Sequence, residues 1–480
     1  MYSLIRLNPF LLWFCGFIFL AKKKLDRLRK ISRVVLAPAI PMAIALWFSA
    51  LIGLSDAYLA GKMSNTALAA LGFCEPLWFL VTLLTTGLCS GIAVGLAAKC
   101  SRDHIQKDGA SQFFLVDSLI ICAAVGLLLL CGALILSVIL SAHPFWLSRT
   151  AQLVADYFLV CALSNLPFAI MQGQCAIFRA AGRGNNVVLL WGVAASIEIV
   201  ASNLLVDVGF LNLTVLAVTW TVACSVSAWI GFILMKPLLQ NFDRRAYCRS
   251  NWSAHVTTVH AVLSVGLPVA VGELGLICGS MLNLYVISTL PGAHNLEAAW
   301  AIKSRLEEAF EVVPICAIGL IIAPFMGWHH GVRSKRVANW AARISFQAAM
   351  TAGCALLMIV ILIQFASRFL AGFFCVDSLL LEQTAQVISL ASLAWPFFAV
   401  TYILSGALEG VRQTLIPTAL HIIFALPVRL GLAIVLKDCP QFSGLTGVTI
   451  AGVVAQALLA IAIVAVFRRT FFKCLARLTV

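Results

Sequence analysis

The stretch from Pro41 to Gly72 reads PMAIALWFSALIGLSDAYLAGKMSNTALAALG. Its first half is apolar apart from Ser49 and Ser55, and it continues an apolar run that starts at Val34. About 20 consecutive apolar residues are enough for a helix to cross a hydrocarbon core about 30 Å thick. The stretch therefore predicts a membrane-spanning helix that carries an aspartate, Asp56, near its far end.

Similar apolar runs recur along the whole chain, and the composition agrees with them. Of the 480 residues, 62% are hydrophobic and 11% are charged, and the mean hydropathy is +1.01. Ordinary soluble domains contain about 25% charged residues, so we predict an all-α membrane protein. The predicted transmembrane helices number twelve, near residues 35–57, 68–98, 113–141, 152–178, 186–206, 211–235, 258–287, 297–327, 340–373, 381–410, 413–436 and 444–467.

The distribution of Lys and Arg predicts the orientation. Cytoplasmic loops of membrane proteins carry an excess of these residues. If the first span starts in the cytoplasm, most of the 33 Lys and Arg residues fall in cytoplasmic segments, and the outside loops hold only Lys62, Arg149, Arg368 and Lys437. We therefore expect a multi-pass protein of the cell (inner or plasma) membrane, with both ends of its core in the cytoplasm. Topology explains the net charge of +14, which gives no indication of nucleic-acid binding.

The two halves of the chain share a pattern of landmarks. Residues of the first half recur in the second at a separation of 227 to 229: Val35 as Val262, Pro41 as Pro268, Ala70 as Ala299, Pro167 as Pro396 and Gly182 as Gly410. Because each copy contains an even number of spans, both copies start on the same side of the membrane. The repeat therefore predicts two pseudo-symmetric six-helix bundles.

The repeat and the polar segments between the spans give predicted domain boundaries. The first bundle covers 34–236, a cytoplasmic linker 237–256, the second bundle 257–468 and a cytoplasmic tail 469–480, and an apolar and basic extension at 1–33 precedes them. Within the extension, residues 9–21 are apolar but short for a span. An interfacial or marginally inserted helix is the preferred interpretation, with a signal-like segment or upstream sequence included by the choice of start site as alternatives.

Motifs in both halves carry a family resemblance. Pro41–Gly72 combines a proline, an aspartate one helix-length later and a Leu-Ala-Ala-x-Gly element. Further motifs are Ile177–Gly182, Gly406–Gly410, Ser304–Glu307, Pro314 and Ala317–Gly319. Together they resemble the multidrug and toxic compound extrusion (MATE) family of the bacterial type, over about residues 33–470. The resemblance implies a secondary active efflux transporter that exchanges protons or sodium for amphipathic, often cationic, drugs or metabolites by alternating access.

Two acids in the first bundle are predicted cation-coupling residues, because a charge inside a bilayer costs at least about 2.5–3.5 kcal/mol. Asp56 matches the aspartate that MATE proteins use for coupling, and the alternative is a solvated residue at a helix end. Glu198 lies in the fifth span, and we expect it to share a cavity with Asp56. Burial and like charge oppose ionisation of both groups, so the pair can carry a proton. The alternative is a structural glutamate that is hydrogen-bonded to Asn203 or to neighbouring helices.

Glu273 in the seventh span is the third predicted cation-coupling residue. Sodium-coupled members of the family often have a glutamate close to this position, and they also use an aspartate in the tenth helix. Here the tenth span has no acid between Ala394 and Ala399. The missing partner for Glu273 favours protons over sodium as the coupling ion.

The eighth span is unusually rich in charge. Lys303, Glu307 and Glu311 follow one another at i,i+4 spacing and so share one helix face. We predict Glu307 and Glu311 as substrate-binding residues, with a structural ion-pair ladder as the alternative. Arg429 in the eleventh span is expected to pair with one of the acids of the eighth span.

Uncharged residues inside the spans complete the predicted substrate site. Gln172 in the fourth span and Asn203 in the fifth are polar candidates for substrate contacts. Flat cationic compounds favour aromatic faces, and the aromatic or sulfur-containing candidates for an apolar cavity are Trp47, Trp78, Phe168, Met171, Trp300, Phe310 and Tyr402.

Other classes of function receive less support from the sequence. A lipid-linked sugar flippase is the alternative transporter, but acids outnumber the bases Lys303, Arg305 and Arg429 inside the spans. No H-E-x-x-H, G-x-S-x-G or P-loop motif indicates an enzyme, and the 16 cysteines show no metal-ligand spacing. We therefore expect no enzymatic activity, no cofactor and no metal. The expected partners are a small-molecule substrate and the lipid bilayer, and the family resemblance implies a monomer.

Overall fold

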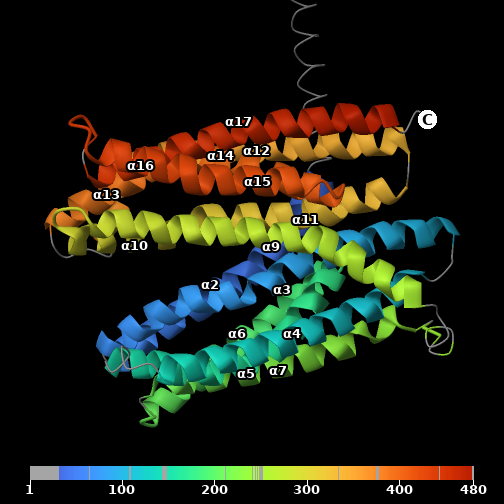
Figure 1. Cartoon of the computed structure of the whole chain (residues 1–480), viewed down its shortest axis with the longest axis horizontal. Coiled ribbons are helices and arrows are strands. Elements are labelled where there is room, and N and C mark those ends of the chain that lie inside the picture. The colour runs from blue at the N-terminus through green and yellow to red at the C-terminus, as the bar shows by residue number, and fades with distance from the viewer. Residues whose placement is uncertain are drawn as a thin grey trace, which may run out of the picture.

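The computed structural model is a bundle of long helices (Figure 1). It describes residues 32–63, 65–106, 110–142, 149–210, 212–240, 242–243, 245, 247, 252–332, 334–373, 378–442 and 444–477. The predicted extension at 1–33, including the apolar segment at 9–21, therefore lies outside the described residues except for Ser32 and Arg33.

Six spans make up the first bundle. The π-helical turn η1 (Ser32–Leu36) leads into the first of them, and the spans are α2 (Ala37–Met63), α3 (Asn65–Gln106), α4 (Ala110–Ala142), α5 (Arg149–Ala180), α6 (Gly184–Asp207) and α7 (Leu213–Met235). The start of α7 is fixed by Asn212, whose side chain accepts a hydrogen bond of 3.2 Å from Thr214 N. Such a cap satisfies one of the free amide groups at a helix start. The 3-10 turn η3 (Lys236–Leu238) follows α7 directly.

The second bundle contains more interruptions. Its elements are α9 (Trp252–Ser288), α10 (Ala293–Glu307), η4 (Glu308–Val312), α11 (Val313–Gly331), α12 (Lys335–Gly372), α13 (Ser378–Ser392), α14 (Trp395–Gly410), α15 (Leu415–Ile423), η5 (Phe424–Val428), α16 (Arg429–Lys437) and α17 (Leu445–Arg477). The π-helical turns η4 and η5 precede Pro314 and contain Pro427, respectively. Proline has no amide proton to donate, so the regular hydrogen-bond ladder is disturbed at both places.

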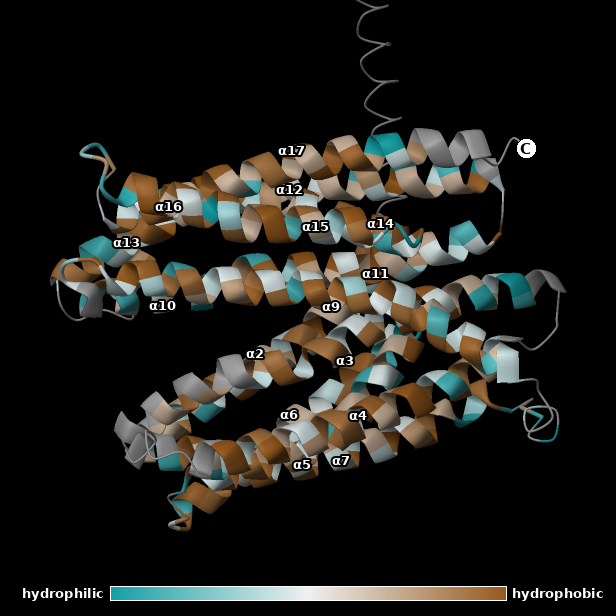
Figure 2. Cartoon of the chain, viewed as in Figure 1, coloured by the Kyte–Doolittle hydropathy of each residue, from teal (hydrophilic) through white to brown (hydrophobic). Residues whose placement is uncertain are grey.

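The number of spans agrees with the sequence. Eleven helices of the described chain are long and apolar enough to cross a membrane, and α13 with α14, bent by 44°, can form a twelfth span. Hydrophobic residues run along the helices (Figure 2), and large apolar side chains such as Phe365 and Ile461 are 86% and 67% exposed. Apolar surface of this extent indicates contact with lipid. The prediction of an all-α protein with twelve transmembrane helices in two bundles is confirmed.

Two helices extend beyond the predicted bundle boundaries. Helix α9 begins at Trp252, inside the segment predicted as a linker (237–256), and α17 continues to Arg477, past the predicted end of the second bundle at 468. Hydropathy marks only the apolar part of a helix. A helix continues into polar sequence as long as no proline or glycine ends it, so the observed bounds are wider.

The two bundles meet at one end and diverge at the other (Figure 1). At the contact, α3 packs against α9 and α11. A Cβ atom at Gly87 would lie 2.3 Å from the carbonyl oxygen of Gly266, and one at Gly91 would lie 2.2 Å from that of Val262. Only glycine allows such an approach. The contact involves the C-terminal half of α3, which is the half predicted to lie toward the cytoplasm.

The turns after α5 and α14 correct one landmark of the predicted repeat. Gly182 has a positive φ of 69°, and the residue with the corresponding conformation is Arg412 (φ 62°), not Gly410. The backbone hydrogen bonds agree, since Arg183 N donates to Phe178 O over 2.8 Å and Gln413 N donates to Leu408 O over 2.9 Å. Glycine usually occupies this conformation, so matching glycines misplaced the second turn by two residues. The separation between equivalent residues here is 230.

Candidate functional site

A cavity of about 770 Å³ lies between the two bundles. One wall comes from α2, α3 and α5, with side chains of α6 and α7, and the other from α9, α10, η4, α11, α14 and α15. Ser90 and Glu409, at its deep end, come from opposite bundles. Pockets of about 300–1,000 Å³ hold drug-sized ligands, so the cavity has the volume of a small-molecule site.

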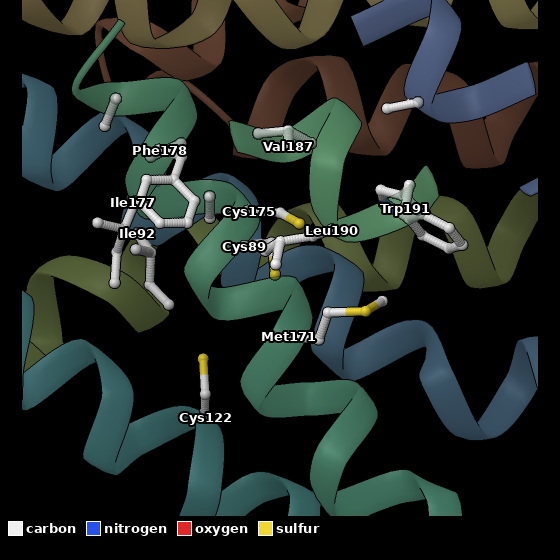
Figure 3. Close-up of a cluster of buried hydrophobic side chains, with 14 of the residues drawn as sticks. Cys89, Ile92, Cys122, Met171, Cys175, Ile177, Phe178, Val187, Leu190 and Trp191 are labelled. Atoms are coloured by element: carbon white, nitrogen blue, oxygen red, sulfur yellow. The ribbon is translucent and has the colours of Figure 1, made fainter. Parts of the chain in front are cut away.

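The first bundle gives the cavity an aromatic wall. Trp78, Phe168, Trp220 and Trp191 line it, and successive ring centroids in this order are 5.8, 5.9 and 6.4 Å apart. Behind the wall, Met171 has no exposed surface and belongs to the buried cluster of Figure 3. This core fixes the positions of the rings.

Some of the predicted aromatic candidates lie elsewhere. Trp78, Phe168 and Tyr402 line the cavity, whereas Trp47, Trp300 and Phe310 do not. Hydropathy places all of these residues inside spans, but only the rotation of each helix decides which of them face the cavity.

Asp56 and Glu198 lie together in the first bundle. Asp56 lines the cavity from α2, and the carboxyl group of Glu198, on α6, is close enough to that of Asp56 for electrostatic interaction. Glu198 has no exposed surface. The hydroxyl oxygens of Ser202 and Thr219 lie 3.1 and 2.9 Å from its Oε1, whereas its Oε2 has no hydrogen-bond partner in the described structure. The structure thus brings these two predicted coupling residues near one another, but only Asp56 lines the cavity that we expected them to share.

The two predicted polar contacts are placed differently. Gln172 lines the cavity from α5. Asn203 does not line it, and its Nδ2 donates a hydrogen bond of 2.7 Å to the carbonyl oxygen of Ile199 on its own helix. Asn203 therefore stabilises a helix turn and makes no hydrogen bond to Glu198.

Glu273 faces the same cavity from α9, and it has an acidic neighbour that the sequence analysis missed. Glu409, near the end of α14, also lines the cavity and interacts electrostatically with Glu273. The tenth span therefore does supply an acid near Glu273, although not between Ala394 and Ala399. The absence of this acid was the argument for protons over sodium, so that argument fails. The motif Gly406–Gly410 could have revealed this acid, since it places a glutamate inside a predicted span.

A hydrogen bond connects the two bundles at the floor of the cavity. Ser90 Oγ on α3 donates to Glu409 Oε2 on α14 over 2.6 Å. The bond lies one residue from Gly91, where the backbones of the two bundles touch. Any motion that separates the bundles at this end must break it.

The remaining charges of the eighth span form a second cluster inside the second bundle. Lys303 Nζ pairs with Glu307, and both Glu307 and Glu311 interact electrostatically with Arg429. None of these four side chains lines the central cavity. Their mutual pairing agrees with the alternative interpretation as a structural ion-pair cluster, and the sequence could not show which acid Arg429 would reach.

Two arginines do line the cavity. Arg305 Nη1 lies 3.3 Å from Glu308 Oε2, one helical turn away. Arg179, at the end of α5, lies within the motif Ile177–Gly182; its Nε is buried and has no hydrogen-bond partner in the described chain. No cluster of His, Cys, Asp and Glu that could hold a metal ion occurs among the residues that the structure describes.

The chain was compared with known proteins by sequence. No protein-family model matches it. It is 22% identical over 403 residues to an FAD transporter from Shewanella oneidensis, covering 80% of this chain and 83% of that protein. It is 21% identical over 450 residues to the probable multidrug resistance protein NorM from Thermotoga maritima, covering 91% of both chains.

Solved structures share the fold. A transporter of the MOP superfamily from Pyrococcus furiosus superposes with a TM-score of 0.81 at 19% identity, over 93% of this chain and 97% of that chain. An outward-facing multidrug resistance transporter of the MATE family gives a TM-score of 0.81 at 20% identity, over 93% and 96%. A MATE transporter from Vibrio cholerae gives 0.78 at 15% identity, over 93% and 98%.

The fold and the matches along nearly the whole chain define a multi-pass membrane protein with the transporter fold of the MOP superfamily. Solved transporters of the MATE family share this fold, and one relative in sequence is a probable multidrug resistance protein NorM; both findings agree with the resemblance seen in the sequence. The proteins that it matches are transporters and not enzymes. These matches do not favour the alternative of a lipid-linked sugar flippase.

Proposed function

We propose that the protein is a secondary active exporter, which exchanges protons or sodium for amphipathic, often cationic, compounds by alternating access. The observation that carries the proposal is the cavity between the bundles, with Asp56 on its wall and Glu198 buried directly behind. Both bundles contribute to this cavity, so a change in their relative position changes access to it.

The acid pair of the first bundle supports coupling to a cation. Among the residues that the structure describes, the partners of Glu198 are hydroxyl groups, and no base forms an ion pair with it. Two adjacent carboxylates in a medium of low dielectric constant strongly favour binding of a proton or a metal cation. A cation bound there favours one arrangement of the bundles, and the substrate binds the other arrangement better.

The walls of the cavity support an aromatic, positively charged substrate. The rings of Trp78, Phe168 and Trp220 offer flat faces, and Glu273 and Glu409 offer negative charge on the opposite side. A cation is attracted both to a carboxylate and to an aromatic face. The name of the NorM relative agrees with drug export, and the name of the Shewanella relative makes a flavin a compound to include in the assay.

We propose roles for the predicted residues accordingly. Asp56, Glu198 and Glu273 act as cation-coupling residues, and Gln172 contacts the substrate from α5. Glu307, Glu311 and Asn203, which lie outside the cavity, serve the packing of their helices. The protein acts without a cofactor, as a monomer in the cell (inner or plasma) membrane, with the ends of its core in the cytoplasm, as the Lys and Arg distribution predicts.

Transport in proteoliposomes tests the proposal. We expect a pH gradient or a sodium gradient, imposed separately, to drive uptake of ethidium or a flavin, and we expect Asp56→Asn to abolish the driven component. The corresponding change from acid to amide at an exposed position, Glu382→Gln, serves as the control, because the Glu382 side chain is 68% exposed and lies outside the cavity. Driven transport that persists at the wild-type rate in Asp56→Asn would remove Asp56 from the mechanism.

A further inference from the structure

The cavity is lined by two equivalent helix faces, one from each bundle. The turns at Gly182 and Arg412 place α5 and α14 in register at a separation of 230 residues. On both helices three cavity-lining residues follow the same spacing, i, i+4 and i+11, which returns to the same face of a helix after three turns. The lining residues are Phe168, Gln172 and Arg179 on α5 and Phe398, Tyr402 and Glu409 on α14.

The equivalent faces end in opposite charges. Arg179 of the first bundle corresponds to Glu409 of the second, and both lie at the deep end of the cavity. Neither residue takes part in an ion pair in the described structure, and Glu409 interacts electrostatically with the carboxyl group of Glu273. Arg179 Nε is buried and has no hydrogen-bond partner among the described residues. The first bundle thus presents an unpaired cation to the cavity, and the second bundle presents a pair of acids.

A cation in the last turn of a helix has a simple structural explanation, because it interacts favourably with the helix dipole. Arg183, another cation near this helix end, does not face the cavity. It lies four residues further along, at the start of α6, and its side chain is exposed and outside the cavity. The dipole alone does not require Arg179 to face the cavity. Arg305, the other arginine of the cavity wall, is already paired with Glu308.

We propose that Arg179 forms an anion subsite, so that the cavity selects aromatic zwitterions. The anionic group of the substrate, a carboxylate, lies at the Arg179 guanidinium, its cationic group lies at Glu409 and Glu273, and its ring system lies on the aromatic wall of Trp78 and Phe168. A guanidinium binds a carboxylate through two parallel hydrogen bonds. This inference rests on the proposed function, because it specifies the substrate of the same cavity.

Dye binding to the purified full chain in lipid nanodiscs tests the subsite. Rhodamine B is a zwitterion with a flat xanthene ring system, and in its ethyl ester an uncharged ester group replaces the carboxylate. A hydrogen-bonded charge pair corresponds to about a ten- to hundredfold change in affinity. We expect wild-type protein to bind the acid about tenfold or more tightly than the ester, measured by fluorescence polarisation without any gradient.

Single substitutions show which residue causes the preference for the acid over the ester. Arg179→Gln should bring the ratio of the two affinities close to one, whereas Arg183→Gln, the same change outside the cavity, should leave the ratio unchanged. Glu409→Gln should weaken both dyes by a similar factor. If Arg179→Gln does not fold, Arg179→Lys keeps the charge but loses the two-pronged geometry, and its ratio should fall part of the way. An unchanged ratio in either Arg179 variant, or equal affinities in the wild type, overturns the subsite.

A second measurement separates this inference from the proposed function. Gradient-driven uptake of rhodamine B ethyl ester in proteoliposomes depends on coupling but not on the carboxylate. Driven uptake with no preference for the acid in binding refutes the anion subsite and leaves the exporter intact. A binding preference that depends on Arg179, without driven uptake of any dye, refutes the exporter and leaves the subsite intact.

Discussion

The two bundles bury charge in opposite ways at nearly equivalent places. In the first bundle, Glu198 on α6 has hydroxyl partners and a second acid, Asp56, as its neighbour. At a separation of 230 residues, the position equivalent to Glu198 is Val428, directly before Arg429. The second bundle thus has a base one residue beyond the position where the first has an acid.

The consequence lies in the balance of charge. In the second bundle, the bases Lys303 and Arg429 face the acids Glu307 and Glu311, so the four charges cancel. A cluster that is neutral by itself has little need for a further ion, whereas two adjacent acids require a cation or a proton. We infer that duplication provided one scaffold, which holds an exchangeable charge in one copy and a permanent ion-pair cluster in the other.

The largest expected effect concerns the acid pair of Asp56 and Glu198 in the first bundle. Glu198→Gln keeps the shape of the side chain and removes its charge, so the proposed cation site loses one of its two carboxylates. We expect gradient-driven transport to disappear while thermal unfolding of the purified protein changes by about 1 kcal/mol or less. Glu382→Gln, an exposed acid paired with Arg368, is the matched control and should transport normally. Normal driven transport by Glu198→Gln would contradict the comparison.

The next largest effect concerns the ion-pair cluster of the second bundle. Arg429→Met leaves Glu307 and Glu311 with Lys303 as their one basic partner in the cluster, and breaking a buried pair from one side costs about 3–5 kcal/mol. Thermal unfolding in detergent should show this loss. Adding Glu311→Gln restores the balance with Lys303 and Glu307 and should recover most of it, as a double-mutant cycle measures. If Arg429→Met is as stable as the wild type, the cluster is not structural.

A smaller effect concerns the contact between the bundles. Gly91→Ala places a methyl group 2.2 Å from the carbonyl oxygen of Val262, and overpacking of this kind costs about 1–3 kcal/mol. Hydrogen exchange in α3 and α9 should become faster at the end where the two bundles meet. Gly132→Ala on α4 is the control, because nothing lies within 4 Å of its added methyl group. Its helix should become more stable by about 0.5–1 kcal/mol. Equal exchange in Gly91→Ala and wild type would show that the bundles do not rely on this contact.

The smallest effect concerns the hydrogen bond at the cavity floor. Ser90→Ala removes the donor to Glu409, whose bond is 2.6 Å long. Glu409 lines the cavity, where water can replace the lost hydroxyl group, so we expect a shift of about 1 kcal/mol or less toward separated bundles. Hydrogen exchange near Gly91 reports this shift, and Ser90→Thr, which keeps a hydroxyl group, should not show it. Identical shifts in both variants would assign the effect to packing instead.

The sequence by itself determined the number of spans, the duplication and the acids inside the membrane. These features follow from local properties, since about 20 apolar residues span a bilayer whatever surrounds them and an embedded carboxylate is costly in any fold. The proximity of Asp56 and Glu198 was also predictable, because α2 and α6 belong to one bundle and both residues are acids within it.

Only the tertiary structure decided which side chains face the cavity. Glu409 and Arg179 face it, whereas Glu307 and Glu311 turn toward Arg429 inside the second bundle. A sequence gives the depth of a residue along its helix. The direction of its side chain depends on how that helix is rotated against its neighbours, and glycine contacts such as that of Gly91 with Val262, which bring together residues far apart in the chain, fix this rotation.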